Sequence, residues 1–292
     1  MIYRLVRELA ADGFPVAVVC RCLGVSRSGY YDWLERGPSA REVADGKLAA
    51  TITEIHAMSR YSYGAPRVHA ELRLGLGIRC GRKRVARLMR TLGIAGICHR
   101  HKRRGHPPAS APHDDLVRRR FIADRPNMLW VTDITQHPTR EGTVYCCAVL
   151  DVYSRMIVGW SIADHMRAEL VVDALQMACW RRRPPPGTIC HSDRGSQYTS
   201  WVFGHRLRQA GLLGSMGRVA SSVDNTMIES LWSTVQRELL DTQRWDTKVQ
   251  LSQAIFEWIE AWYNPRRRHT SIGDLSPVAY EHAAARAAES AA

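Results

Sequence analysis

The sequence lacks a hydrophobic run long enough to cross a membrane. Its most apolar early segment, Phe14–Cys20, is far shorter than the roughly 20 residues that a membrane-spanning helix needs. Arg21 follows closely, and no small-residue cleavage pattern of a secretory leader accompanies the segment. We therefore expect a protein that is neither exported nor membrane-bound.

Paired CxxC motifs are also absent, although the chain has eight cysteines. Several of them, such as Cys146 and Cys147, lie inside apolar runs, as buried reduced thiols do, which favours a cytosolic protein. The segment Cys98-His99-Arg100-His101 contains zinc-binding residue types. These residues are too closely spaced for a tetrahedral site, however, and no second pair stands at a finger-like spacing. We expect no zinc site here.

Acidic residues are scarce in the first 120 residues, which contain 10 Asp and Glu against 23 Lys and Arg. The rest of the chain contains 18 of each, so the front carries the whole net charge of +13. A basic part joined to a neutral part is typical of a polyanion-binding module attached to a second activity. The alternative is a surface that arginine merely makes soluble. With 45% hydrophobic residues, the chain can build two modest domains.

The basic front contains a helix-turn-helix pattern over residues 15–37. Apolar residues repeat at helical spacing over residues 17–23, Gly24 breaks the helix, and Ser26 is a natural N-cap for a second helix through Leu34. Such a unit places side chains at the front of its second helix against DNA. The candidates there are Arg27, Ser28 and Tyr30. A purely structural pair of helices is the alternative.

The pattern recurs over residues 63–96. We predict a helix from about Pro66, a glycine-rich turn at 75–81, and a helix from Arg82 to Leu92 with an apolar stripe of Val85, Leu88, Met89 and Leu92. Cations cover most of its outer face, and they repel one another unless phosphates neutralise them. The candidate phosphate-binding residues are Arg67, Arg82, Lys83, Arg84 and Arg87.

A basic segment, residues 99–120, follows this second pattern. It contains Lys102, Arg103 and Arg104 and a pair of prolines. The composition is that of a linker, which either lies along a DNA backbone or acts as a solvated tether.

The back half of the chain has the texture of an α/β domain. We predict strands over residues 128–135, 144–151, 156–162 and 188–192, with an amphipathic helix over 167–183 that three prolines stop. Two of these strands end on an acid, Asp133 and Asp193, and sites in such sheets gather at strand ends. A third acid, Glu229, lies one turn into a helix that Asp224 or Asn225 caps. Each acid could also be an ordinary cap or surface residue.

Three converging carboxylates repel one another unless some are protonated or divalent metal neutralises them. Oxygen-only ligands favour Mg²⁺ or Mn²⁺, and two such ions form a device for phosphoryl transfer. The residues alone leave this convergence a hypothesis.

Several segments carry a resemblance to a known family. They are LWVTDIT around Asp133, LDVYSRMIVGW, HSDRGSQYTS around Asp193, DNTMIESLWSTVQREL around Glu229, and the tail WYNPRRRHTSIGDLSPVAY. The front segments CRCLGVSRSGYYDW and YGAPRVHAEL match as well, and 35 residues separate Asp193 from Glu229. The chain resembles the OrfB transposases of the insertion-sequence-3 family, members of the D,D(35)E group, over about residues 18–280.

The resemblance implies an RNase H-like, retroviral-integrase-like core with a mixed five-stranded sheet flanked by helices, preceded by an all-α helix-turn-helix-like region. It implies Asp133, Asp193 and Glu229 as the catalytic and metal-binding triad, with Mg²⁺, or Mn²⁺ as a substitute, in two ions. Water then cuts at the element's ends, and the freed 3′-hydroxyl attacks another strand directly, typically through a circular intermediate. No covalent protein–DNA intermediate is needed.

The sequence departs from the family at Gln236, seven residues after Glu229, where Lys or Arg is usual. Arg237 lies roughly 80° around the helix from Glu229 and could take over the contact. Other candidate DNA-binding residues are Gln197, Tyr198, Gln236, Arg237, Arg266, Arg267 and Arg268. The arginine run could instead neutralise the protein's own acids. Asp151 is an outer-shell candidate for metal or a salt-bridge partner of Arg155, and His191 a phosphate contact or a structural residue.

We predict five regions along the chain: residues 1–60 and 61–98, both helix-turn-helix-like, the linker 99–120, the catalytic core 121–245 and a helical tail 246–292. The expected partners are double-stranded DNA, an OrfA protein and further copies of the chain, at the bacterial nucleoid in the cytoplasm. The chain starts at Met1 and has no long leucine heptad run, so it resembles OrfB alone. The alternatives are an inactive DNA-binding remnant and a nuclease that cuts without joining.

Overall fold

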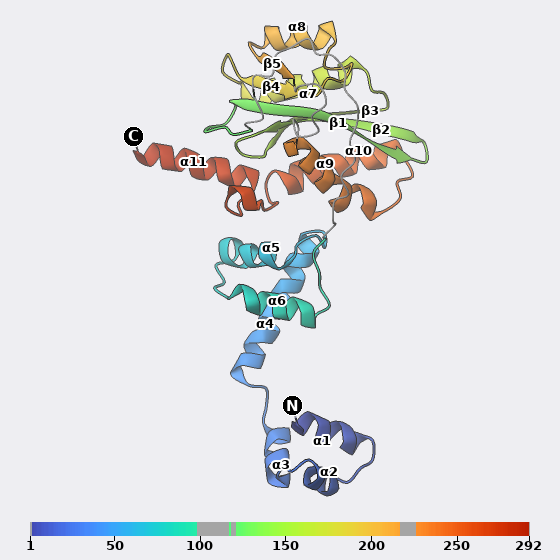
Figure 1. The fold of residues 1–292 in the computed structure, drawn as a ribbon, viewed down its shortest axis with the longest axis vertical. Helices are drawn as coiled ribbons and strands as arrows, with labels where there is room; N and C mark the ends of the chain where they lie inside the picture. Colours follow the sequence, from blue (N-terminus) through green and yellow to red (C-terminus); the bar gives the residue numbers. More distant parts are fainter. Residues whose placement is uncertain (1, 98–116, 118–120, 217–225, 292) are drawn as a thin grey trace.

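The computed structural model describes residues 2–97, 117, 121–216 and 226–291. Three parts follow one another along the chain: α1–α3, α4–α6, and a sheet flanked by helices (Figure 1). The predicted basic linker, with Lys102, Arg103 and Arg104, lies outside the described residues apart from Val117. The predicted caps Asp224 and Asn225 lie outside them as well.

The first three helices form a small unit with its own core of Val6, Val19, Cys20 and Tyr30. They are α1 (Ile2–Ala11), α2 (Val16–Cys22) and α3 (Arg27–Glu35). The predicted helix-turn-helix is confirmed, and the Ser26 hydroxyl accepts a hydrogen bond of 2.8 Å from the Gly29 N–H as an N-cap. Sequence patterns did not predict α1, which packs on both other helices.

The second unit consists of α4 (Ala40–Met58), α5 (Ala65–Ala70) with a π-helical extension (Glu71–Gly75), and α6 (Arg82–Thr91). The predicted pair α5 and α6 is confirmed, but Leu92 follows the end of α6 and is exposed. A capping box of Ser39 and Glu42 starts α4. Because α4 shares its core with α5 and α6, the division predicted at residue 60 cuts α4 from its packing partners.

The third unit is built on a five-stranded mixed sheet in the order β3-β2-β1-β4-β5. The strands are β1 (Leu129–Thr139), β2 (Gly142–Asp151), β3 (Ile157–Ala163), β4 (Ile189–Ser192) and β5 (Leu213–Met216). β1 pairs antiparallel with β2 and parallel with β4, and β4 pairs parallel with β5. The predicted α/β class and mixed sheet are confirmed.

Helices cover both faces of the sheet (Figure 1). α7 (Ala168–Arg182) and α8 (Trp201–Gln209) pack on the face that Trp130 shares. The opposite face, which Leu129 and Val131 share, packs against α9 (Thr226–Glu238) and α10 (Lys248–Glu257). This alternation along β1 follows the two-residue period of a strand. It decides which side chains of β1 can meet α9.

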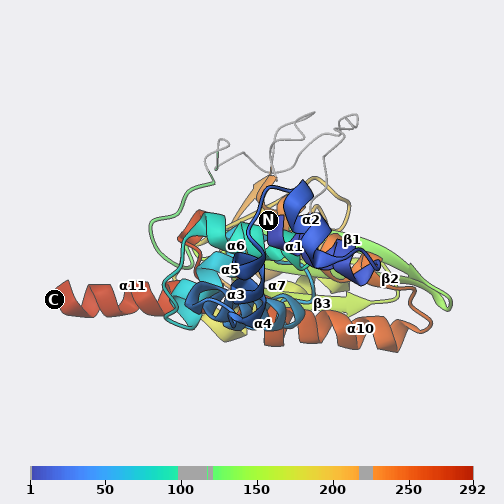
Figure 2. The ribbon, with the colours of Figure 1, turned by 90° about the horizontal axis from the view of Figure 1, so that it is seen from below.

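The tail runs from a short 3-10 turn (Leu240–Thr242) through α10 into a π-helical segment (Trp258–Tyr263), a second 3-10 turn (Thr270–Ile272) and α11 (Pro277–Ala291). The buried side chains of Trp258, Trp262 and Tyr263 belong to the same core cluster as α4–α6 and the α9 face of the sheet. The tail is thus packed between these parts, whereas α11 projects away from them (Figures 1 and 2).

The described cysteines are all free, and Cys20, Cys146, Cys147 and Cys190 are buried, as predicted for reduced thiols. In the described part of the chain, no helix is long and apolar enough to cross a membrane.

At Gly159 the sheet lies very close to the backbone of α7. A Cβ atom there would lie 2.2 Å from the Ala174 carbonyl oxygen and 2.6 Å from the Ala178 nitrogen. We expect Gly159→Ala to lower the free energy of unfolding by about 1–3 kcal/mol, because the helix backbone must move. Gly46→Ala is the matched control: nothing lies within 4 Å of its Cβ position in α4. That change should raise stability by about 0.5–1 kcal/mol. Equal effects in urea titrations of the two variants would contradict the close contact.

Candidate active site

The register of β1 and β4 brings Asp133 and Asp193 side by side. The parallel pairing runs from Leu129 opposite Ile189 to Thr132 opposite Ser192. Asp133 directly follows Thr132, and Asp193 directly follows Ser192. The prediction that Asp133 ends its strand is wrong, because β1 continues to Thr139 in antiparallel pairing with β2. What ends at Asp133 is the parallel ladder, so both carboxylates still leave the sheet at one point.

Asp133 is half-buried and follows Leu129 and Val131 on the α9 side of β1. Burial, the charge of Asp193 and, more weakly, the charge of Glu229 raise the pKa of Asp133 to about 7. The Ile134 backbone N–H and the Trp232 indole act in the opposite direction. Two further carboxylates therefore lie close enough to repel Asp133, as the converging triad predicts.

Asp193 and Glu229 are both exposed, and each lies in a defined local structure. The Asp193 carboxylate accepts a hydrogen bond of 3.0 Å from the Gly195 N–H, so it also shapes the turn after β4. Glu229 stands in the first turn of α9, where the helix dipole favours a negative charge. The stripe predicted for this helix is confirmed, since Met227, Leu231 and Val235 are buried against the sheet. Glu229 thereby stays at the edge of the packed face.

The three acids fit a hard divalent cation by chemistry. They supply only oxygen ligands, and their mutual repulsion is the charge that Mg²⁺ or Mn²⁺ would neutralise. Within the described ranges, no three His, Cys, Asp or Glu side chains are close enough together to hold one ion. The fit therefore rests on the donor set and on the raised pKa of Asp133; the identity and number of the ions stay predictions.

Trp232 is a site residue that sequence patterns did not single out. It lies three residues after Glu229, hence on nearly the same side of α9, and it packs against the core beside the sheet. Its indole Nε1 is buried without a hydrogen-bond partner of ordinary geometry among the described residues, yet it lowers the pKa of Asp133 as a nearby dipole. The signal available in the sequence was an aromatic residue three positions after the acid Glu229.

Several predicted DNA-binding residues lie on the surface. Arg27 and Ser28 are exposed at the start of α3, and Arg82 and Lys83 are exposed at the start of α6. Arg84 and Arg87 lie on α6 as well, but both already pair with Asp45 of α4, each at 2.7 Å. The protein's own acid therefore neutralises part of the cationic face, which weakens the inference that phosphates must do so. DNA contact by all these residues stays a prediction.

Two predicted contact residues are in the core, and we correct their role. Tyr30 is 4% exposed and packs against the rings of Tyr3 and Trp33. Tyr198 is 2% exposed, and its hydroxyl lies 3.2 Å from the Thr132 Oγ1 atom. Both rings stabilise the local packing, so neither can contact DNA in this structure.

The arginine run 266–268 is mostly internal, against the prediction of a phosphate-binding surface. Arg267 is 3% exposed and donates two hydrogen bonds to Glu238, and Arg268 donates one of 2.6 Å to Glu71. The alternative interpretation, neutralisation of the protein's own acids, therefore holds for these two. Arg266 is exposed and keeps its predicted role.

The residues around the family's usual Lys or Arg position are engaged locally. The Gln236 side chain donates a hydrogen bond to Asp241, and Arg237 donates one of 2.8 Å to the Ser233 carbonyl. Gln197 donates to the Met166 carbonyl at 3.0 Å. All three are half-buried, and their contact with DNA stays a prediction.

His191 and Asp151 have structural surroundings. His191 is buried, with its Nδ1 atom 3.0 Å from the Ser215 hydroxyl and its ring edge against Phe121. Asp151 is fully buried and accepts hydrogen bonds from the Asn127 and Tyr153 backbone N–H groups. Among the described residues the cation that pairs with it is Arg182, at 4.0 Å, so the salt bridge predicted with Arg155 is wrong.

Comparison with known proteins places this site in a family context. Residues 123–222 and 211–277 match families described as "Integrase core domain", and residues 42–102 match the "HTH-like domain". The last match spans most of α4 as well as α5 and α6, in agreement with their shared core.

The chain is similar along most of its length to proteins of bacterial insertion elements. It is 37% identical to the transposase for insertion sequence element IS904 of Lactococcus lactis, over 85% of this chain and 98% of that one. It is 34% identical to transposase InsF for insertion sequence IS3A of Escherichia coli, over 97% and 99% of the two chains. The 31 kDa protein of insertion element IS600 from Shigella sonnei is 38% identical over 90% and 97%.

Among solved structures, the HTLV-2 integrase catalytic core domain in complex with magnesium aligns with 55% of this chain and 100% of its own, with a TM-score of 0.43 and 14% identity. The matches to the relatives at 34–38% identity extend over nearly the whole length of those relatives. The chain belongs to the transposases of the insertion-sequence-3 family.

Proposed function

We propose that this transposase cuts the ends of its insertion sequence and joins them to another strand with Asp133, Asp193 and Glu229 as catalytic residues. In the first step, water attacks the phosphorus at the element's end and releases a 3′-hydroxyl. In the second, that 3′-oxygen attacks a second phosphodiester, forms a new P–O bond and releases another 3′-hydroxyl. One phosphodiester replaces another in the second step, so no external energy source is needed.

The observation that carries this proposal is the joint position of Asp133 and Asp193 at the end of the parallel ladder, with the charge of Glu229 acting on Asp133. These three carboxylates would hold Mg²⁺ or Mn²⁺ as the two-ion set of phosphoryl transfer, which would supply activation of the attacking oxygen and stabilisation of the leaving one. The positions of the two aspartates are fixed by β1 and β4, and the glutamate is carried by α9.

DNA binding by the front units supplies the substrate. The exposed cations Arg82 and Lys83 on α6, together with Arg27 on α3, offer phosphate contacts on two successive helix-turn-helix-like units. We infer that an OrfA protein and further copies of the chain join the complex that holds both element ends. We infer also that it works at the bacterial nucleoid in the cytoplasm.

The test is strand transfer on DNA that carries this element's own ends, with Mg²⁺ and then Mn²⁺, with and without OrfA. We expect joined product from the wild type and none from Asp193→Asn, because Asn cannot supply the anionic ligand. Cut but unjoined ends would favour a nuclease. Neither product under any condition, with intact DNA binding, would favour an inactive DNA-binding remnant.

A further inference from the structure

Glu238 lies at the far end of the helix that carries Glu229. It is the last residue of α9, nine positions after Glu229, or about 13 Å along the axis. Unlike Glu229, it is buried, with a relative exposure of 5%. A buried carboxylate is stable only with charged or hydrogen-bonding partners, so its partners determine where α9 is held.

The first partner comes from the tail. The Arg267 guanidinium donates hydrogen bonds of 2.8 and 2.7 Å to the two Glu238 oxygens. The tail is itself fixed to the sheet, because the Asn264 side chain accepts from the Ile157 N–H and donates to its carbonyl, both at 2.9 Å. Through Arg267 the end of α9 is therefore tied to β3.

The second partner comes from the DNA-binding front. Arg67 of α5 was predicted to bind phosphate, but its Nη1 atom lies 3.8 Å from the Glu238 Oε1 atom and its guanidinium lies over the Tyr63 ring. Its side chain is 30% exposed, whereas that of Glu238 is 6% exposed. The two arginines share one carboxylate, because the Glu238 Oε1 atom lies 2.7 Å from Arg267 as well as 3.8 Å from Arg67. Burial and the nearby charge of Arg267 lower the pKa of Arg67.

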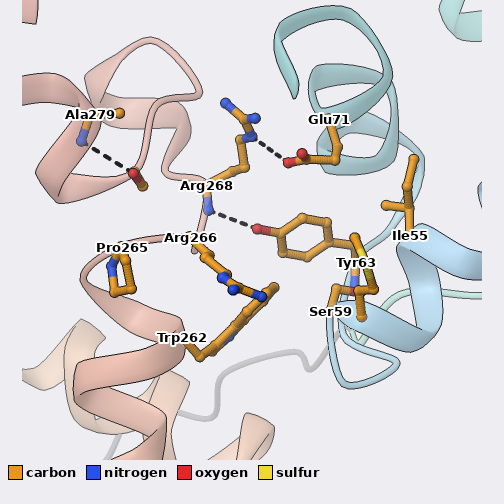
Figure 3. A pocket seen from close by; sticks show the side chains of 11 residues that line it. Ile55, Ser59, Tyr63, Glu71, Trp262, Pro265, Arg266, Arg268 and Ala279 are labelled. Carbon is orange, nitrogen blue, oxygen red and sulfur yellow. Dashed lines mark hydrogen bonds and ion pairs between the residues drawn. The ribbon is translucent and has the colours of Figure 1, made fainter. Parts of the chain in front are cut away.

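The next tail residue, Arg268, also joins the tail to the α4–α6 unit (Figure 3). The Arg268 N–H donates to the Tyr63 hydroxyl at 2.7 Å, and its side chain donates to Glu71 at 2.6 Å. Between these contacts a cavity of about 230 Å³ remains, bordered by Ile55 and Trp262. Since Arg268 binds both Tyr63 and Glu71, these residues form a joint between α4–α6 and the tail, which we call the seam and which is only partly filled.

We propose that Glu238 is a positioning residue. Through its contact with Arg67, it links the position of the α4–α6 unit to the position of α9, the helix that carries Glu229. When DNA holds α4–α6, Arg67 pulls on the carboxylate at one end of α9, and Glu229 at the other end takes its place beside Asp133 and Asp193. This inference rests on the proposed roles of α6 and Glu229. A rigid helix transmits such a shift along its length, and about 1 Å at a catalytic group can cost on the order of a hundredfold in rate.

The experiment compares Arg67→Gln with Arg60→Gln in the full-length protein. Arg60 stands on the same seam, but its partner is the exposed Glu257 at 3.9 Å, away from α9. We expect Arg67→Gln to lower the single-turnover strand-transfer rate at saturating DNA roughly five- to thirtyfold. The DNA dissociation constant and the melting temperature should stay near the wild-type values. Arg60→Gln should change none of the three.

Two further measurements separate this link from other roles of Arg67. In the double variant Arg67→Gln/Glu238→Gln, the loss of Arg67 should have no additional effect on the rate, because the carboxylate it acts on is gone. A rise in the DNA dissociation constant alone would make Arg67 a phosphate contact, and an unchanged rate would overturn the link.

Calorimetric titration of Mn²⁺ into the DNA-bound protein covers the case in which the wild type joins no ends. Failure of wild-type joining, with Asp193→Asn no different, would reject the proposed function. In that case the proposed link between Arg67 and α9 still predicts that Arg67→Gln binds Mn²⁺ more weakly than Arg60→Gln does. Equal Mn²⁺ affinities of the two variants would overturn it.

Discussion

Asp133→Asn should lower the rate of strand transfer by at least roughly a thousandfold. The same change should stabilise the metal-free protein at pH 8. The first effect follows from the loss of an anionic oxygen where the two strands deliver both aspartates. The second follows from the pKa of Asp133, which is about 7 in the folded chain and about 3.9 in an unfolded one.

The direction of the pH effect is fixed by proton binding. Below about pH 4 both states of the chain carry the proton, so Asp133 contributes nothing. As pH rises from about 4 to about 7, the unfolded chain loses the proton and the folded one keeps it, so stability falls. Above pH 7 the folded protein carries the full cost, about 1–3 kcal/mol after allowance for partial exposure. Asn is neutral and removes this cost.

The measurement is urea unfolding of wild type and Asp133→Asn in EDTA at pH 5 and pH 8. The variant should gain stability over the wild type as pH rises between these values. Asp173→Asn, which removes an exposed carboxylate from α7 on the other face of the sheet, serves as the control and should show no such gain. The same difference between wild type and Asp133→Asn at both pH values would mean that Asp133 is not held in a repulsive site.

The sequence was most informative where the signal is local. Ser26 caps α3 as predicted, because an N-cap needs only a hydroxyl at the right offset from a helix. The strands that lead to Asp133 and to Asp193 were recognisable from short apolar runs. Their register was not, since the pairing of Thr132 with Ser192 joins residues that are far apart in sequence. That register, more than the strand ends, brings the carboxylates together.

The errors arise where a distant partner decides the environment. The run Arg266 to Arg268 looks like a surface patch, because consecutive arginines are usually solvated. Two of the three instead pair with carboxylates on α9 and after α5, which no local pattern can indicate. The same holds for Tyr30 and Tyr198, whose rings face cores assembled partly from other segments.

The largest stability effect should come from the buried pair at the end of α9. Glu238→Ala leaves Arg267, 3% exposed, as a buried cation that has lost its two hydrogen bonds to a carboxylate. Burial alone lowers the pKa of an arginine, but the hydrogen bond and charge of Glu238 more than offset this and raise that of Arg267. We therefore expect Glu238→Ala to lower the free energy of unfolding by about 3–5 kcal/mol.

Replacing both partners tests whether the loss comes from the stranded charge. Glu238→Leu/Arg267→Met fills a similar volume with apolar side chains and should be within about 1–2 kcal/mol of the wild type in urea unfolding. Such a double variant would be stable but should remain slow in strand transfer, because the end of α9 is no longer tied through charge to Arg67. If Glu238→Ala costs no more than the double variant does, the buried pair is not what holds this end of the catalytic helix.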